Sequence, residues 1–390
     1  MGGKLIENIG GVLEKCTKKP YQFNWVPGLF IIIYHLALLI GLPFYFAFCT
    51  VSSWPLIVSS FALMYAAGLS ITMGYHRLYS HMAYKASPIL EVILVLFGTL
   101  ATQGSVIRWS FDHRHHHAFV DTDRDPYSIK KGFWYAHFFW LFEKPKKIES
   151  SVVADLERKP LLRFQHRYYG ILFVVTNVLA YLFFASVFQD YLGALVFTIL
   201  LRIFFLHHFT WFINSLAHTW GARTFCKELS AVDNYIIALL TFGEGYHNYH
   251  HTFAQDYRNG IRWFHFDPTK WLIWLSAKCG LARQLRTVQQ YQIEEKILLE
   301  RKRLLLDKLG ESFYIQREEW EKKITAVIDN VLVKWKQVRK LQESYTSLKK
   351  EGAKELLSSL KLEIKALKKS LEEEYQNWTA VSAEIASLSQ

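Results

Sequence analysis

The sequence predicts an all-α integral membrane protein: a four-helix transmembrane bundle followed by a coiled-coil tail. Two observations lead to this fold class. Four apolar segments, at 28–49, 54–73, 170–188 and 192–214, have about the 20 residues that a helix needs to cross a bilayer. Beyond residue 288 the pattern changes, and apolar residues recur at alternating spacings of four and three, which is the heptad repeat of packed helices.

The basic residues indicate how the apolar segments are oriented. The net charge is +12, and Lys and Arg crowd the connection between the second and third segments, whereas neither short loop, 50–53 or 189–191, carries any. Positively charged connections stay on the cytosolic side. We therefore expect both termini and the long connection in the cytosol, in a bacterial inner membrane or the endoplasmic reticulum. Basic residues that flank apolar segments also argue against nucleic-acid binding.

A further apolar stretch, at 89–103, is predicted not to span the membrane. It is short, and Glu91 lies near its start. A fifth span would also place the histidine motifs described next on opposite sides of the bilayer. We expect a helix that lies at the interface or is buried in the cytosolic domain.

Nine of the sixteen histidines are spaced as metal ligands. Eight of them form one HxxxxH and two HxxHH motifs, and the ninth, His218, follows the WFINS segment. The nine are His76, His81, His113, His116, His117, His218, His247, His250 and His251. On a helix, HxxHH places three rings on one face, because residues three and four apart are neighbours. Neutral imidazole binds iron, zinc and copper. Nine ligands are too many for one ion and suit two, so we expect a cytosolic helical domain that holds two metals.

These motifs resemble the three histidine boxes, of the same types and in the same order, that define the membrane fatty acyl desaturases. Further matches lie at 74–77 (GYHR), 121–126 (DTDRDP) and 211–215 (WFINS). The resemblance covers about residues 25–287. We therefore expect a membrane-embedded desaturase domain at 1–287 and a separate helical tail at 288–390.

The resemblance implies an oxygen-dependent enzyme that inserts a cis double bond, of the Δ9 type, into a saturated acyl chain. It also implies two iron ions (Fe2+) in the histidine site, because oxidising an unactivated methylene needs a strong oxidant made from dioxygen. Acyl-CoA is favoured over a lipid-bound chain as the substrate. The electrons would come from a separate protein of the ferredoxin or cytochrome type, since the sequence lacks the His-Pro-Gly-Gly motif of a fused haem domain.

Other residues take their expected roles from their places in these motifs. Asn214 would contact one iron through a water molecule. Four acidic residues would orient imidazole N–H groups: Asp112, Asp121, Asp125 and Glu244. The substrate would be bound by Trp109, Trp211, Arg108, Lys130 and Lys131. Two departures count against acyl-CoA: Phe111 stands where animal relatives usually have Arg, and the segment 263–271 looks more like bacterial members, some of which act on lipid-bound chains.

Two other functions stay open at this point. Hydroxylation uses the same site and diverges only after the first hydrogen abstraction. A non-enzymatic membrane scaffold or metal-binding protein would act through the tail. The tail has two apolar runs on either side of Gly352, each with one charged slot, Lys334 and Glu374. The runs either fold back as an antiparallel hairpin, in which these charges meet, or associate with another chain as a parallel dimer.

Overall fold

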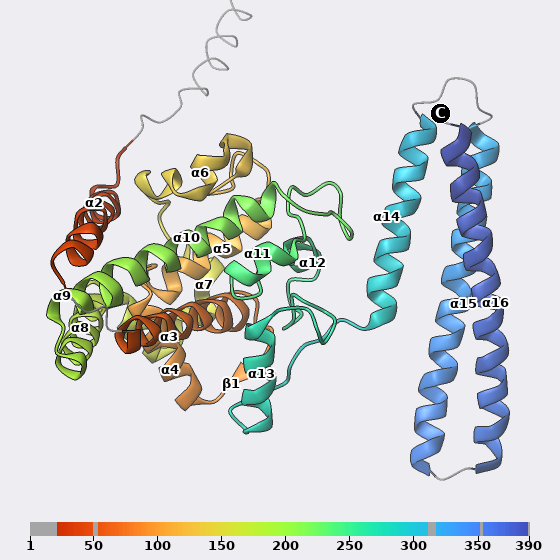
Figure 1. The fold of residues 1–390 in the computed structure, drawn as a ribbon. Helices are drawn as coiled ribbons and strands as arrows, with labels where there is room; N and C mark the ends of the chain where they lie inside the picture. The colour runs from red at the N-terminus through yellow and green to blue at the C-terminus, as the bar shows by residue number, and fades with distance from the viewer. Residues whose placement is uncertain (1–21, 50–53, 311–316, 352–353, 389–390) are drawn as a thin grey trace, which may run out of the picture. The chain divides into compact units, whose positions relative to one another are not determined.

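The computed structural model describes residues 22–49, 54–310, 317–351 and 354–388. These residues form helices and one two-stranded sheet (Figure 1). Contacts divide the chain into two compact units. The first comprises Met1–Gly221, Asn234–His247 and Tyr257–Leu285, and the second comprises Ala222–Asp233, Asn248–Asp256 and Arg286–Gln390.

Four helices of the first unit are long and apolar enough to cross a membrane: Trp25–Phe48, Trp54–Ser80, Pro160–Phe188 and Tyr191–His218. The predicted all-α fold with four spans is therefore confirmed. The first span is α2 and the third is α8 (Figure 1). The second consists of α3 (Trp54–Ser70) and the π-helix η2 (Ile71–Ser80), and the fourth of α9 (Tyr191–Gly193), η5 (Ala194–Leu201), α10 (Arg202–Asn214) and η6 (Leu216–His218).

The second and fourth helices continue past the ends that the sequence predicted, 73 and 214, and the added residues carry histidines. His76 lies in η2, and His218 ends η6. Both helices bury half of their most apolar stretch inside the protein, whereas α2 and α8 bury 22% and 17%. The second and fourth helices are thus the inner pair, and they carry ligand candidates directly out of the apolar bundle.

The apolar stretch predicted at 89–103 forms α4 (Pro88–Leu100), a 13-residue helix that is too short to count among the candidate spans. Its start is well defined, because the Ser87 side chain accepts a hydrogen bond from the Leu90 N–H and proline fits the first turn. Glu91 forms an ion pair with Lys159 at 2.8 Å. The helix is therefore anchored by a cap at its start and a charge pair in its first turn.

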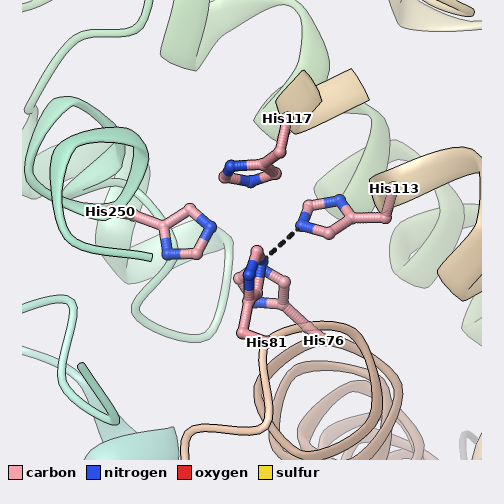
Figure 2. A group of neighbouring side chains, drawn as sticks. All are labelled: His76, His81, His113, His117 and His250. Carbon is pink, nitrogen blue, oxygen red and sulfur yellow. Dashed lines mark hydrogen bonds between the residues drawn. The ribbon is translucent and has the colours of Figure 1, made fainter. Parts of the chain in front are cut away.

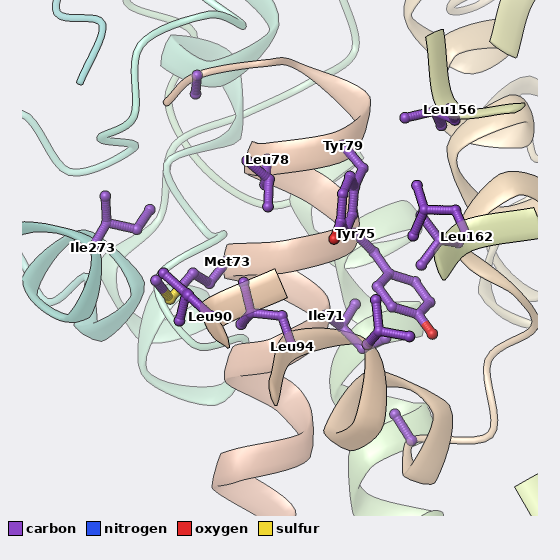
Figure 3. Close-up of a cluster of buried hydrophobic side chains, with 14 of the residues drawn as sticks. Ile71, Met73, Tyr75, Leu78, Tyr79, Leu90, Leu94, Leu156, Leu162 and Ile273 are labelled. Atoms are coloured by element: carbon purple, nitrogen blue, oxygen red, sulfur yellow. The ribbon is translucent and has the colours of Figure 1, made fainter. Parts of the chain in front are cut away.

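The main core of the first unit surrounds η2 (Figure 3). Its buried side chains come from η2, α4, α5 (Val106–Phe119), α7 (Ser150–Glu157), α8 and α13 (Pro268–Lys278), among others. Gly98 of α4 lies against the Tyr75 ring, and a Cβ atom there would come within 2.3 Å of Tyr75 Cε1. Only glycine allows this approach. Since every residue of η2 is buried, the packing fixes the rotation of the helix that carries the first histidine motif.

Short elements complete the first unit. They are η3 (Ile129–Lys131), α6 (Phe133–His137), η4 (Phe139–Phe142), α11 (Tyr235–Leu240) and the start of α12 (His247–Thr252). The strand β1 (Lys85–Ala86) pairs with β2 (Ala282–Arg283) in an antiparallel arrangement. This pairing ties the segment that follows the first histidine motif to the last residues of the unit.

The second unit contains three long helices: α14 (Gln290–Gly310), α15 (Arg317–Glu351) and α16 (Lys354–Leu388). Helices α15 and α16 lie side by side (Figure 1). Lys334 pairs with Glu374 at 2.8 Å, and Lys323 pairs with Glu384 at 3.2 Å. Because the partner number rises on α16 as the number falls on α15, the helices are antiparallel. Of the two arrangements that the sequence left open, the structure has the antiparallel hairpin with facing charges, while Gly352 lies outside the described residues.

Candidate metal centre

Four histidines from two helices form a first group. His76 and His81 come from η2 and the residue after it, and His113 and His117 come from α5. One ring nitrogen of each lies within 4.8 Å of the corresponding nitrogens of the others. Figure 2 shows these rings turned toward one another, and His81 Nε2 lies 2.8 Å from His113 Nε2.

The π-helical form of η2 explains why the first motif has the spacing HxxxxH. In an α-helix, residues five apart point about 140° away from each other, because each residue turns the helix by about 100°. A π-helix bonds residue i to residue i+5, and the His81 N–H donates to the His76 carbonyl oxygen at 3.1 Å. The wider turn therefore places His76 and His81 on one face, with ring centroids 4.8 Å apart.

A second group contains His116 of α5, His218 of η6 and His247 at the start of α12. One ring nitrogen of each again lies within 4.8 Å of the others. His247 Nε2 and His218 Nε2 are 3.1 Å apart, and all three side chains are buried. Helix α5 thus contributes to both groups: His113 and His117, four residues apart, share one group, and His116 belongs to the other.

Two buried carboxylates contact the Nδ1 atoms of candidate ligand rings. Glu244 Oε2 lies 3.0 Å from His76 Nδ1, and Asp125 Oδ1 lies 2.9 Å from His116 Nδ1. A carboxylate that binds Nδ1 fixes the ring so that Nε2 is the nitrogen available to a metal. Asp121 supports this arrangement through its backbone N–H, which donates to Asp125 Oδ2 at 3.3 Å.

The other predicted acidic residue, Asp112, has a different partner. Its carboxylate accepts hydrogen bonds from the Arg108 side chain, four residues earlier on α5. A role for Asp112 in orienting an imidazole therefore stays a prediction. His115, the variable position of the second motif, lies outside both groups: its ring stacks on Phe111, and its Nε2 is 3.3 Å from Lys146 Nζ.

A buried ion network behind the first group was not foreseen from the sequence. Arg77 contacts Glu244 at 2.8 Å and Asp267 at 2.9 Å, and all three side chains are at most 1% exposed. Burial raises the pKa of Glu244, but Arg77 and His76 outweigh burial and lower this pKa to about 2. Glu244 is therefore an anion that holds His76 on one oxygen and Arg77 on the other. The only indication in the sequence was the position of these residues: Arg77 directly follows His76, and Asp267 directly precedes Pro268, which starts α13.

The histidine groups suit a cationic metal. Burial, together with the neighbouring histidines, lowers the pKa of His113, His117 and His247 well below the usual value. These rings are therefore neutral, and each offers a nitrogen lone pair to a cation. Imidazole is a ligand for iron, zinc and copper. The donor set therefore fits transition-metal ions and agrees with the predicted metal site.

The groups border a cavity of about 520 Å3, within the range of about 300–1,000 Å3 that is typical of small-molecule sites. The predicted residues Asn214, Trp109, Trp211, Arg108 and Lys131 line it together with His76, His113, His116 and His247. Trp109 stacks on His113, with ring centroids 4.9 Å apart. Lys130 lies beside Lys131 in η3 and is exposed. Lysines 144 and 146 add further positive charge to the lining.

A family model described as fatty acid desaturase matches residues 52–282, the stretch that holds all three histidine motifs. The chain belongs to the fatty acid desaturase family. It is a multi-pass membrane protein, and its buried histidine groups are those of a metal site.

Three relatives illustrate the range of this family. A probable acyl-CoA desaturase of Schizosaccharomyces pombe is 43% identical over 291 residues, which cover 73% of this chain and 59% of the relative. Acyl-CoA desaturase 1 of Saccharomyces cerevisiae is 39% identical over 71% of this chain and 54% of the relative. An sn-2 palmitoyl-lipid 9-desaturase of Nostoc is 34% identical over 71% of this chain and 95% of the relative. The chain thus matches little more than half the length of the two yeast proteins.

Proposed function

We propose that this protein is an oxygen-dependent desaturase that inserts a cis double bond, of the Δ9 type, into a saturated acyl chain. The observation that carries the proposal is the pair of buried histidine groups on the wall of one cavity. Each group supplies neutral nitrogen ligands, and the cavity brings a long apolar substrate past both. Bound iron supplies the redox chemistry with dioxygen that protein side chains lack.

Two iron ions are the proposed occupants, and α12 is proposed to complete both groups. On α5, His113 and His117 are four residues apart and belong to one group, whereas His116 belongs to the other. The same spacing on α12 assigns His251 to the group of His247, and assigns His250 to the group of His76 and His113. Asn214 lines the cavity and is proposed to reach one iron through a water molecule.

The protein's own residues position the substrate and the ligands. Glu244 and Asp125 keep the Nε2 atoms of His76 and His116 aimed at the metals. Trp109 and Trp211 line the cavity and form walls that orient the acyl chain. Arg108, Lys131, Lys144 and Lys146 line the cavity and are proposed to bind the phosphates of a CoA group, so acyl-CoA is the proposed substrate.

The remaining assignments follow from the sequence. Both termini are proposed to lie in the cytosol of a bacterial inner membrane or the endoplasmic reticulum. A separate ferredoxin or cytochrome is proposed as the electron donor. Residues 1–287 are proposed as the catalytic domain and 288–390 as a non-catalytic tail, because every proposed ligand precedes residue 288.

Expression in a host without its own Δ9 desaturase, followed by gas chromatography and mass spectrometry of the fatty acids, tests this function. New cis-monounsaturated chains are expected, with an iron-to-protein ratio near two in purified enzyme. His116→Ala should abolish the product. His115→Ala is the matched control from the same motif and should retain it, because this ring lies outside both groups. If the products were hydroxylated chains, the enzyme would be a hydroxylase and not a desaturase. Unchanged fatty acids in cells that express the protein fully would contradict the assignment as an enzyme.

A further inference from the structure

Three histidines outside the two groups form a hydrogen-bonded array in the first unit. His35 of α2 bonds to His208 of α10, with 3.1 Å between their Nε2 atoms. His208 Nδ1 lies 3.0 Å from Nε2 of His137, the last residue of α6. The array ends at the Ile31 carbonyl oxygen, 2.7 Å from His35 Nδ1, and at Ser215 Oγ, 2.9 Å from His137 Nδ1.

The end groups determine which nitrogen carries each proton. A carbonyl oxygen only accepts, so His35 Nδ1 donates to Ile31. A neutral imidazole has one donor and one acceptor nitrogen. It follows that His208 donates to His35 and that His137 donates to His208. The Ser215 hydroxyl donates to the Trp211 carbonyl oxygen at 3.0 Å, so its single proton is not committed to His137 Nδ1. The bonds between the three rings then need no net charge, which suits a site between apolar spans. Burial lowers the pKa of His137 to about 4, in agreement with a neutral ring.

The three rings of the array pack near the Trp211 indole. The indole ring lies 5.0 Å from His208, 5.8 Å from His137 and 6.5 Å from His35, measured between ring centroids. It is 5% exposed and lines the cavity, as does Asn214 one turn later on α10. Swinging the indole away from the cavity would require these rings to move, and His35 and His208 are each hydrogen-bonded at both ring nitrogens. The array therefore stiffens one cavity wall from behind.

We propose that His35, His137 and His208 are positioning residues that hold Trp211 as a fixed wall of the acyl cavity, and thereby set the position of the double bond. This inference rests on the proposed desaturase function. Successive methylenes of an acyl chain are chemically alike, so contacts along the chain do not by themselves select one carbon. The shape of the walls must fix how far the chain runs past the metals. A wall that yields allows the chain to slide, and oxidation then occurs at more than one position.

The test compares the products of His208→Leu, which removes the central link, with those of His208→Gln, whose amide retains a donor and an acceptor. His35→Leu removes the outer link independently and provides the answer if His208→Leu does not fold. His265→Leu is the control, because this ring stacks on Tyr246 and is not part of the array. Double-bond positions are read by mass spectrometry of derivatised products, and iron content is measured in parallel.

Both leucine variants are expected to spread the double bond over neighbouring positions while they retain iron, with His208→Gln closer to the wild type and His265→Leu unchanged. A fall in turnover that follows protein or iron content, with the double bond still at one position, would overturn the inference. Absence of any alkene from the wild-type protein would instead contradict the proposed function. The two failures are therefore distinguishable in one experiment.

Discussion

Replacing Glu244 by Gln is expected to weaken metal binding while it leaves the fold largely intact. Glu244 accepts from His76 at 3.0 Å through one oxygen and from Arg77 at 2.8 Å through the other. Loss of the carboxylate behind a histidine ligand typically lowers metal affinity about 10–100-fold, which corresponds to about 1.4–2.8 kcal/mol. Arg77 keeps its contact with Asp267 at 2.9 Å, so its buried guanidinium stays paired with an anion.

Asp267→Asn is the matched comparison, because it alters the other end of the same network. Asp267 accepts from Arg77 and from three backbone N–H groups, those of Asn259 at 2.9 Å, Gly260 at 3.1 Å and Lys270 at 2.9 Å. Either substitution leaves Arg77 paired with the other carboxylate, but Asp267→Asn also weakens the three backbone hydrogen bonds, and a hydrogen bond to a charged group contributes about 1.5–3 kcal/mol. The contact between Glu244 and His76 survives this change. Stability should therefore fall more than metal affinity.

The assay measures two quantities for each variant. Thermal unfolding of metal-free protein in detergent reports stability, and competition with a chelator reports iron affinity. Glu244→Gln should shift mainly the second quantity and Asp267→Asn mainly the first. If both variants lost iron affinity and stability in the same proportion, Glu244 would act only through the fold, and the reasoning about His76 would be refuted.

The remaining predictions concern topology and the tail. A cysteine at Gln189 should react with a reagent that does not cross membranes, whereas a cysteine at Lys144 should react only after permeabilisation, because the basic connection is expected in the cytosol. Deletion of 317–390 should leave iron content and turnover near wild type, since all proposed ligands precede it. Cysteines at Ala326 and Ala380 should crosslink within one chain, because α15 and α16 form an antiparallel hairpin.

Each of these has a contrary result that is easy to recognise. External labelling at Lys144 would reverse the orientation. Loss of turnover on deletion of 317–390, with normal iron and protein content, would give the tail a direct role in donor docking or substrate delivery. Crosslinked dimers in place of crosslinked monomers would show that the two helices pair between chains.

The sequence determined the elements whose signals are local. A hydrophobic run of about 20 residues is sufficient to predict a span. The heptads in 320–388 predicted packed helices but left open whether they pair within one chain, as the structure has them, or between chains. The histidine motifs likewise predicted a metal site, because residues three and four apart on a helix share a face. Each of these inferences needs only the period of one helix and the chemistry of its side chains.

Tertiary structure decided how those elements combine. No local pattern showed that η2 is π-helical, although that form is what places His76 and His81 on one face. The division of the α5 histidines between two groups depends on which helices pack on either side. The contact of Arg77 with Asp267 joins residues 190 apart in the sequence. Spacing within a helix states which side chains share a face, but only packing determines what that face meets.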